Sequence, residues 1–420
     1  MNRRSFLAAA GAAATLSGAG CTAVSVRPPP PTELWRVSPE GGSYALRRVT
    51  DDRVFATLGE TLTALDRETG ERLWTADTGS FVLATPDGFL APDGASGVVA
   101  LSAADGGVRW RRESVPGLLV GHAGGVAVVV DKGDDGSRVT GVDLATGGTA
   151  WRRTLPGRWD VWTHAAPVDA PTGGGTDAVI GSRSDDSGAV ARVVVRSLDP
   201  ETGASLGRMR REGWVRPVGA AYGVVGFEWS GVEPAANAAL FAGRSTLDVR
   251  WTYAPARSPL AVAVEGRHAL VGAHGSAIRG RPSGTVTAVH RGPGSFSPVP
   301  AATTRDRALF ARHTSAGDDF EDRVVAVDAA DPDGAATWRG PSVPERLSRT
   351  TATGDAVVYA TLGGESVVTG LDAATGRTRW RLTEHVSNTW AVGGGLLFAG
   401  VSTGPDRRER ALVAYAVDRP

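Results

Sequence analysis

Residues 63–76 read TALDRETGERLWTA, and this phrase recurs along the chain, in its best copies with an Asp (once Ser102), a Gly and a Trp at fixed offsets. A short apolar run meets Asp66, a polar break closes on Gly70, and a second run ends in Trp74. An Asp at the start of a turn accepts hydrogen bonds from backbone amides, and Gly adopts the positive φ that other residues avoid. The phrase therefore predicts a β-hairpin.

Seven further stretches repeat the phrase with differing fidelity. The three closest copies are 99–112 (VALSAADGGVRWRR), 140–153 (TGVDLATGGTAWRR) and 369–382 (TGLDAATGRTRWRL). Weaker copies lie at 197–207, 240–251, 285–296 and 326–338. The first of these has Gly207 where the Trp is expected, and the copy around His290 retains only a strand and a Gly-rich break.

A second apolar run precedes each copy, so a unit of roughly 35 to 55 residues contains about four short strands. A sheet of this size buries both of its faces only when it stacks radially against neighbours. Residues 411–418 (ALVAYAVD) form the first half of the phrase, and Trp35 near the start of the chain belongs to a second half. We therefore expect an all-β propeller of eight blades with four antiparallel strands each, closed by pairing of the N- and C-terminal strands. Nine units can be counted, which makes nine blades the alternative.

The composition indicates one large all-β domain. The 420 residues include 56 Gly and 25 Pro, which suits a fold rich in turns. The formal net charge is zero, so no global field attracts nucleic acid or an anionic membrane. We expect a monomer that binds another protein and no nucleic acid.

The N-terminus, MNRRSFLAAAGAAATLSGAGC, has the features of an export signal. Arg3 and Arg4 precede an apolar run that is too short to span a membrane as a mature helix. This segment resembles a twin-arginine signal, and its ending at Cys21 resembles a lipobox, whose cysteine is lipidated after cleavage. We expect a signal peptide at 1–20, a Pro-rich tether at 21–32 and a propeller at 33–420. A lipidated Cys21 would hold the protein on the outer face of the cytoplasmic membrane, and an unmodified one would leave it secreted.

The pattern ALDxxTGxxxW resembles the repeat of the PQQ-like (pyrroloquinoline-quinone-like) β-propellers, which include quinoprotein dehydrogenases and BamB-like lipoproteins. The resemblance covers most of the chain after Glu33 and implies that each repeated Trp docks against the next blade. This structural role would fall on Trp35, Trp74, Trp110, Trp151, Trp251, Trp338 and Trp380. Replacing a buried docking Trp by Ala is expected to cost about 3–5 kcal/mol.

The resemblance leaves both binding and catalysis open. A quinoprotein dehydrogenase would hold its quinone and Ca²⁺ under a disulfide between adjacent cysteines, whereas Cys21 is the only cysteine of this chain. We therefore expect no cofactor, no metal and no catalytic residue, and predict a non-enzymatic, surface-tethered scaffold that binds a protein. A quinone-dependent dehydrogenase and a sugar- or small-ligand-binding propeller are the alternatives, because a fold does not settle function.

Two aromatic residues outside the repeat are candidates for a binding site. Trp159 and Trp162, with His164 beside them, would form an exposed patch for a protein or a sugar. The alternative is that they cover the long unit that follows Trp151. If Trp159 is exposed, Trp159→Ala should lower the stability of the fold much less than the same substitution at a docking Trp.

The remaining polar candidates have weaker patterns. The acidic loops at 131–136 and 318–322 offer oxygens to Ca²⁺ but lack the ordered spacing of a calcium loop, and solvated hairpin tips are the simpler interpretation. His268 and His274 would lie about 20 Å apart on one strand, too far to share a metal. Serine nucleophiles have no recognisable motif here.

Overall fold

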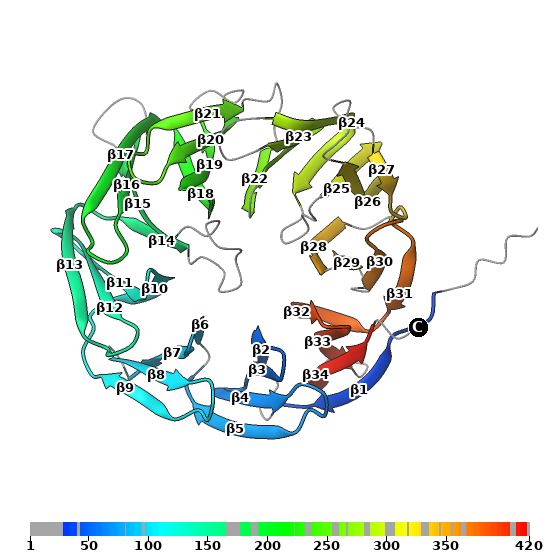
Figure 1. Ribbon diagram of the computed structural model, residues 1–420, viewed down its shortest axis with the longest axis horizontal. Helices are drawn as coiled ribbons and strands as arrows, with labels where there is room; N and C mark the ends of the chain where they lie inside the picture. The colour runs from blue at the N-terminus through cyan, green and yellow to red at the C-terminus, as the bar shows by residue number, and fades with distance from the viewer. Residues whose placement is uncertain are drawn as a thin grey trace, which may run out of the picture.

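The computed structural model is a ring of antiparallel β-sheets around a central axis (Figure 1). Every regular element in the part of the chain that it describes is a strand, and no helix there is long and apolar enough to cross a membrane. The architecture is a β-propeller. The structure describes residues 28–39, 43–79, 81–94, 97–164, 177–185, 192–221, 223–231, 237–253, 260–265, 268–280, 286–298, 307–316, 319–328, 336–343, 346–353, 356–362, 367–403 and 409–417.

Six blades each consist of four strands that follow one another along the chain, with the first strand innermost (Figure 1). The first three are β2 (Tyr44–Val49), β3 (Arg53–Leu58), β4 (Thr61–Asp66) and β5 (Arg72–Asp77); β6 (Leu83–Thr85), β7 (Gly88–Asp93), β8 (Gly97–Ser102) and β9 (Val108–Arg112); and β10 (Leu118–Ala123), β11 (Val126–Gly133), β12 (Gly136–Asp143) and β13 (Thr149–Pro156). The other three are β14 (Asp160–His164), β15 (Ala178–Asp185), β16 (Arg192–Leu198) and β17 (Ser205–Glu212); β18 (Trp214–Ala221), β19 (Val224–Ser230), β20 (Asn237–Gly243) and β21 (Val249–Tyr253); and β28 (Arg346–Thr353), β29 (Ala356–Leu362), β30 (Val368–Asp372) and β31 (Thr378–Leu382).

The seventh four-stranded blade joins the two ends of the chain. It contains β32 (His385–Gly393), β33 (Leu396–Thr403), β34 (Glu409–Ala416) and, as its outermost strand, β1 (Thr32–Val37). The antiparallel pairing of β1 with β34 places Trp35 opposite Ala414. The ring is thus closed by the terminal strands, as the two halves of the phrase at the chain ends predict.

The predicted number of blades is wrong. Seven four-stranded blades are present, where we expected eight, with nine as the alternative. The remaining strands form one six-stranded sheet, composed of β22 (Leu260–Glu265), β23 (His268–Gly280), β24 (Val286–Pro298), β25 (Arg307–Ala316), β26 (Asp319–Asp328) and β27 (Ala336–Arg339). The Gly-rich break near His290 does not end a hairpin. Instead β24 continues through it, pairs with β23 and then with β25, and so merges the two units that we had counted separately.

The hydrophobic core lies between the blades. In β3, all residues from Val54 to Leu58 are buried, because both faces of the sheet are covered by neighbouring blades. One cluster joins Trp151 of the β10–β13 blade to Val179 and Val194 of the next. A single blade would expose these apolar faces, so burial of apolar area between neighbours stabilises the ring.

Candidate functional site

The repeated turn between the third and fourth strands is held by its Asp. The Oδ1 atom of Asp66 accepts hydrogen bonds from the amides of Glu68 (3.0 Å) and Thr69 (2.8 Å) and from the Thr69 hydroxyl (2.9 Å). These bonds to Thr69 hold the pKa of Asp66 below its ordinary value. Asp143, Asp199 and Asp372 make the same contacts in their turns. The Asp and Thr of the phrase are therefore engaged within the turn.

The repeated tryptophans reach from one blade to the turn of the next. In four cases the indole N–H donates to the carbonyl oxygen of the residue that follows the first position of that turn. The pairs are Trp35 to Arg67 (2.9 Å), Trp110 to Leu144 (2.9 Å), Trp151 to Pro200 (2.7 Å) and Trp338 to Ala373 (2.9 Å). These contacts support the structural role proposed for the repeated Trp.

The backbone of the turn glycine packs against the ring of the docking indole. Its φ lies between 67° and 73°, and a Cβ atom added to it would come within 2.4 to 2.6 Å of the ring. The pairs are Gly70 with Trp35, Gly106 with Trp74, Gly147 with Trp110, Gly203 with Trp151, and Gly376 with Trp338. Gly is therefore required at this position both by the backbone conformation and by the close approach of the tryptophan.

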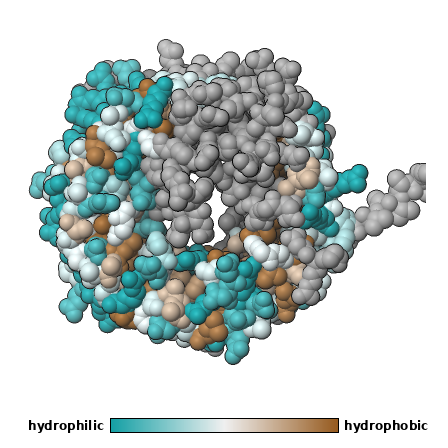
Figure 2. Space-filling model, viewed as in Figure 1, coloured by the Kyte–Doolittle hydropathy of each residue, from teal (hydrophilic) through white to brown (hydrophobic). Residues whose placement is uncertain are grey.

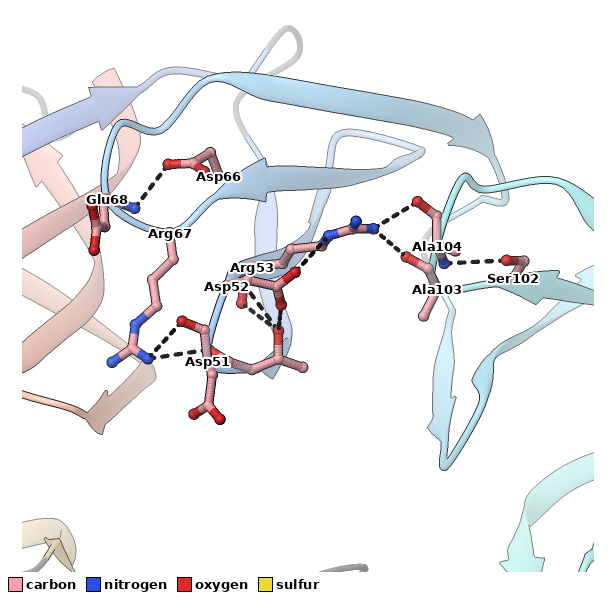
Figure 3. A network of polar contacts seen from close by, with 10 residues as sticks. Asp51, Asp52, Arg53, Asp66, Arg67, Glu68, Ser102, Ala103 and Ala104 are labelled. Atoms are coloured by element: carbon pink, nitrogen blue, oxygen red, sulfur yellow. Dashed lines mark hydrogen bonds and ion pairs between the residues drawn. The ribbon is translucent and has the colours of Figure 1, made fainter.

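Trp74 departs from this hydrogen-bonding scheme. Its indole N–H is buried without a partner in the described structure, although its ring packs on Gly106. The guanidinium of Arg53 instead donates to the carbonyl oxygens of Ala103 (3.0 Å) and Ala104 (2.6 Å), as Figure 3 shows. At this junction, the interblade hydrogen bonds to the turn are therefore made by Arg53 and not by the indole of Trp74.

Two other docking candidates have different surroundings. Trp251 is half-buried and stacks on Phe241 of its own blade, with ring centroids 3.8 Å apart. Trp380 is buried, but its indole N–H has no partner among the described residues. The blade after Trp380 is the closing one, where the chain ends replace the turn that other docking tryptophans contact.

Arg67 links the first blade to the closing blade. Its guanidinium donates to the carbonyl oxygens of Thr50 (3.3 Å) and Asp51 (3.2 Å), a contact visible in Figure 3, and also to that of Gly393 in the β32–β33 turn. The side chain also lies over the ring of Phe398, 5.9 Å from its centroid. These contacts reinforce the junction at which the ring is closed.

The three residues of the candidate patch, Trp159, Trp162 and His164, do not form one surface, because Trp159 is buried and the other two are partly exposed. Trp159 is 1% exposed and lies in the core, with the guanidinium groups of Arg183 and Arg196 over its ring at 5.8 and 5.5 Å. Trp162 is half-buried and stacks on His164, with centroids 5.6 Å apart. Trp159 is therefore not available to a partner at the surface, because it packs between blades as a structural tryptophan.

His164 ends the innermost strand of its blade. Burial lowers its pKa, and the negative charge of Asp177 opposes this shift. His122, at the corresponding end of the preceding inner strand β10, experiences the same two effects. Both imidazoles are therefore partly desolvated and both feel the negative charge of Asp177, on inner strands near the axis of the ring (Figure 1).

The other polar candidates are distributed over separate places. In the loop at 131–136, Asp131 pairs with Arg138 (3.4 Å), and the neighbouring Lys132 pairs with Asp160 (2.5 Å). The described residues contain no group of three or more His, Cys, Asp or Glu side chains placed to hold a metal ion. Arg3, Arg4 and Cys21 lie outside the described residues.

The sequence interpretation missed a His–Asp pair. Asp322, assigned above to a solvated acidic loop, is 1% exposed, and its Oδ2 lies 2.6 Å from Nδ1 of His313. The same oxygen accepts the amide N–H of Leu347 (2.9 Å), at the start of the next blade. The available signal was the spacing of the two residues along β25 and β26, whose antiparallel register places His313 opposite Asp322.

Where Figure 2 colours the side chains of the face in view, hydrophilic and hydrophobic groups are interspersed. The fold and its repeated docking contacts define a propeller of PQQ-like repeats. The family model described as "Outer membrane protein assembly factor BamB" matches residues 23–158 and 320–415. This match covers more than half of the 420 residues, and the chain belongs to that family.

Two solved structures with TM-scores above 0.5 show the same overall fold at low sequence identity. A eukaryotic initiation factor is 10% identical, with a TM-score of 0.58 over 84% of this chain and 91% of its own. The computationally designed protein Ika8 is 13% identical, with a TM-score of 0.52 over 91% and 99%. BamB from Moraxella catarrhalis is 16% identical, with a TM-score of 0.46 over 80% and 96%. No curated protein matches the sequence significantly.

Proposed function

We propose that this protein is an exported β-propeller that serves as a scaffold for another protein. The observation that carries the proposal is its membership of a family described as an outer membrane protein assembly factor, since an assembly factor acts on other proteins. The Asp, Gly and Trp of the repeat are engaged inside the ring. Binding therefore falls to loops and strand ends, which every blade of a propeller contributes to both faces of the ring.

Exposed apolar side chains favour one face of the ring for this role. Four antiparallel strands return the chain to the end from which it started, so the inner strands of successive four-stranded blades begin on the same face. On that face Phe81 precedes β6, while Leu118 and Trp214 begin β10 and β18; their exposed fractions are 45%, 68% and 54%. Large exposed apolar and aromatic side chains are typical of protein interfaces.

Site-specific photocrosslinking tests this assignment. A photoreactive amino acid at 81, 118 or 214 is expected to capture one common partner. Trp214→Ala should weaken binding of the purified partner about tenfold or more, as truncation of a tryptophan at the centre of an interface does. Leu73 and Val108 are suitable control positions, because they are 45% and 55% exposed but begin outer strands towards the opposite face. Equal crosslinking at the control positions, or unchanged affinity of the Trp214 variant, would contradict the proposal.

The residues present lack one feature that the resemblance implies for a quinoprotein dehydrogenase. The resemblance implies a disulfide between adjacent cysteines over the quinone, and Cys21 has no second cysteine with which to pair. The sugar-binding alternative loses Trp159, which is buried. Titration with pyrroloquinoline quinone and Ca²⁺ tests the first alternative, because stoichiometric binding seen in the absorbance spectrum would restore it.

The proposed location follows from the N-terminal sequence. We propose that Arg3 and Arg4 direct twin-arginine export and that a lipid on Cys21 anchors the mature protein outside the cytoplasmic membrane. Intact-mass measurement of the membrane fraction should find a protein that lacks residues 1–20 and is heavier by a lipid. Unaffected export after replacement of both arginines by Lys would point to a different route.

A further inference from the structure

The outer strands of the ring contain an excess of positive charge. The outermost strands of the sheets are β1, β5, β9, β13, β17, β21, β27 and β31 (Figure 1). As the structure describes them, these strands contain 14 arginines and three acidic residues, an excess of 11 positive charges. The whole chain, in contrast, has 45 basic and 45 acidic residues. Positive charge is therefore concentrated on the circumference of the ring.

Most of this excess lies on three successive blades. Strands β9, β13 and β17 contain three, two and three arginines, and Glu212 is their only acidic residue. The three strands follow one another along one arc of the circumference (Figure 1). All of these arginines except Arg112 are exposed, and Arg112 is half-buried. We call the eight arginines of β9, β13 and β17 the basic arc.

Ion pairs neutralise only a part of the basic arc. Two of its arginines have acidic partners on their own blade, in the pairs Arg111–Asp93 (2.8 Å) and Arg109–Asp87 (3.9 Å). Glu212 lies 3.5 Å from Arg192 of β16, so its charge is directed to an arginine outside the arc. Arg152, Arg210 and Arg211 form no ion pair with any residue that the structure describes. A net positive charge thus remains at the surface.

Two arginines extend the basic arc across the seams between its blades. Arg112 donates to the carbonyl oxygen of Gly147 (3.1 Å), in the turn of the next blade. Arg153 donates in the same way to the carbonyl oxygen of Gly203 (3.0 Å), one blade further on. A carbonyl acceptor holds a guanidinium group in place without neutralising its charge. The positive surface is therefore continuous over both seams.

Protection of the strand edges does not explain the sign of this charge. Charged side chains on an edge strand keep it from pairing with another chain, and acidic residues would prevent such pairing as basic ones do. A surface of one sign additionally attracts ligands of the opposite charge. The guanidinium group binds carboxylate and phosphate groups through two parallel hydrogen bonds. The basic arc is consequently suited to a ligand with several anionic groups.

The shape and composition of the arc favour one kind of anionic ligand. Its three blades point outwards in different directions, so a flat membrane would contact only a part of it, whereas a flexible chain can follow it (Figure 1). The aromatic residues of the three strands, Trp110 and Trp151, are only 9% and 6% exposed. The arc therefore lacks the aromatic rings on which nucleobases stack and the aromatic anchor typical of a protein interface.

We propose that the basic arc binds an anionic polysaccharide, whose sugar units carry carboxylate or sulfate groups. The arc lies on the outer wall of the ring, whereas Phe81, Leu118 and Trp214 lie on one of its faces. This binding is therefore independent of the protein-binding role, and both ligands can be bound at once. Its strength comes from ionic contacts and the release of counterions, so it should fall steeply with increasing salt concentration.

Charge reversal within the arc tests the proposal. The triple variant Arg152→Glu, Arg210→Glu and Arg211→Glu is expected to bind fluorescently labelled polygalacturonate about tenfold or more weakly than the unmodified protein at about 0.1 M salt. The slope of log affinity against log salt concentration should also become shallower by roughly one or more. Because the three side chains are exposed, circular dichroism should show an unchanged fold.

A second triple variant is the matched control. Arg339→Glu, Arg377→Glu and Arg381→Glu make the same change in net charge at exposed positions in or beside β27 and β31, across the ring from the basic arc (Figure 1). The Debye length is about 10 Å at 0.1 M salt, so these distant charges should alter the affinity by about twofold or less. Equal weakening in the two variants would overturn the proposal, because binding would then follow net charge alone.

The choice of ligand is tested with the unmodified protein. Polygalacturonate presents carboxylates and dextran sulfate presents sulfates, and binding to at least one of them is expected, with no binding to neutral dextran. Binding to neither anionic polymer at low salt would overturn the proposal. Tighter binding to phosphatidylglycerol vesicles or to single-stranded DNA, lost in the Arg152, Arg210 and Arg211 variant, would overturn the assignment to a polysaccharide.

Discussion

At the scale of single residues, burial separates the structural tryptophans from the exposed ones. Trp151 is 6% exposed and donates its indole N–H to Pro200, whereas Trp214 is 54% exposed. Trp151→Ala is therefore expected to lower the free energy of unfolding by about 3–5 kcal/mol. Trp214→Ala should change it by about 0.5 kcal/mol or less. Chemical denaturation measures both, and equal effects would be incompatible with the docking role.

Trp159 belongs to the first group, contrary to the expectation from sequence. With 1% exposure it is buried more deeply than Trp110, at 9%. Its position outside the repeat register suggested a surface patch, yet the polypeptide between β13 and β14 carries it into the seam below Arg183 and Arg196. Its substitution by Ala should thus be as destabilising as that of a docking tryptophan.

At the scale of elements, one junction between blades has its large and small residues in reversed positions: the strand carries the glycine and the turn carries the large side chain. Gly207 occupies the Trp position of β17, and Leu247, with φ of 57° and 2% exposure, occupies the Gly position of the next turn. A Cβ atom added to Gly207 would lie 2.4 Å from the backbone carbon of Thr246. The large residue has moved from the strand to the turn, so the same interblade volume is filled from the other side.

This exchange predicts coupling between the two positions. Leu247→Gly removes a buried side chain, which should lower the free energy of unfolding by about 2–5 kcal/mol. Relief of the left-handed backbone strain at this position should return about 1 kcal/mol of that loss. Gly207→Trp alone should destabilise the protein through the clash with Thr246. The double variant restores the Trp–Gly pair and should lose less than the sum of the single losses, by about 0.5–3 kcal/mol in a denaturation cycle. Strict additivity would show that the two residues do not share one packing site.

At the scale of the whole molecule, stability depends on closure of the ring. Strand β1 supplies the outer strand of the closing blade, and Trp35 docks against the turn of the first blade. Deletion of residues 1–37 should therefore open the ring, expose the edge of β34 and lower the melting temperature strongly. Deletion of 1–27 retains β1 and is the matched control. Identical melting curves for the two truncations would contradict the importance of closure.

The amino-acid sequence by itself determined the local unit: a hairpin whose turn is stabilised by Asp66 and Gly70 and whose second strand carries Trp74. The hydrogen bonds and backbone conformation of a turn involve only a few neighbouring residues, so any one copy of the repeat predicts the turn. Repetition of the unit then implies radial stacking of the sheets. Only the tertiary structure decided the fate of the irregular segment around His290. There β24 pairs with both β23 and β25, and merges two units into one sheet.

The same distinction applies to the candidate sites. The burial of Trp159 and the contact of His313 with Asp322 arise from packing between blades that are distant along the chain or from the register of long strands. A shift of one residue in such a register would move each side chain to the other face of the sheet. Register is selected by the sum of many contacts across the seams, so the pairing of His313 with Asp322 could be found only in the folded ring.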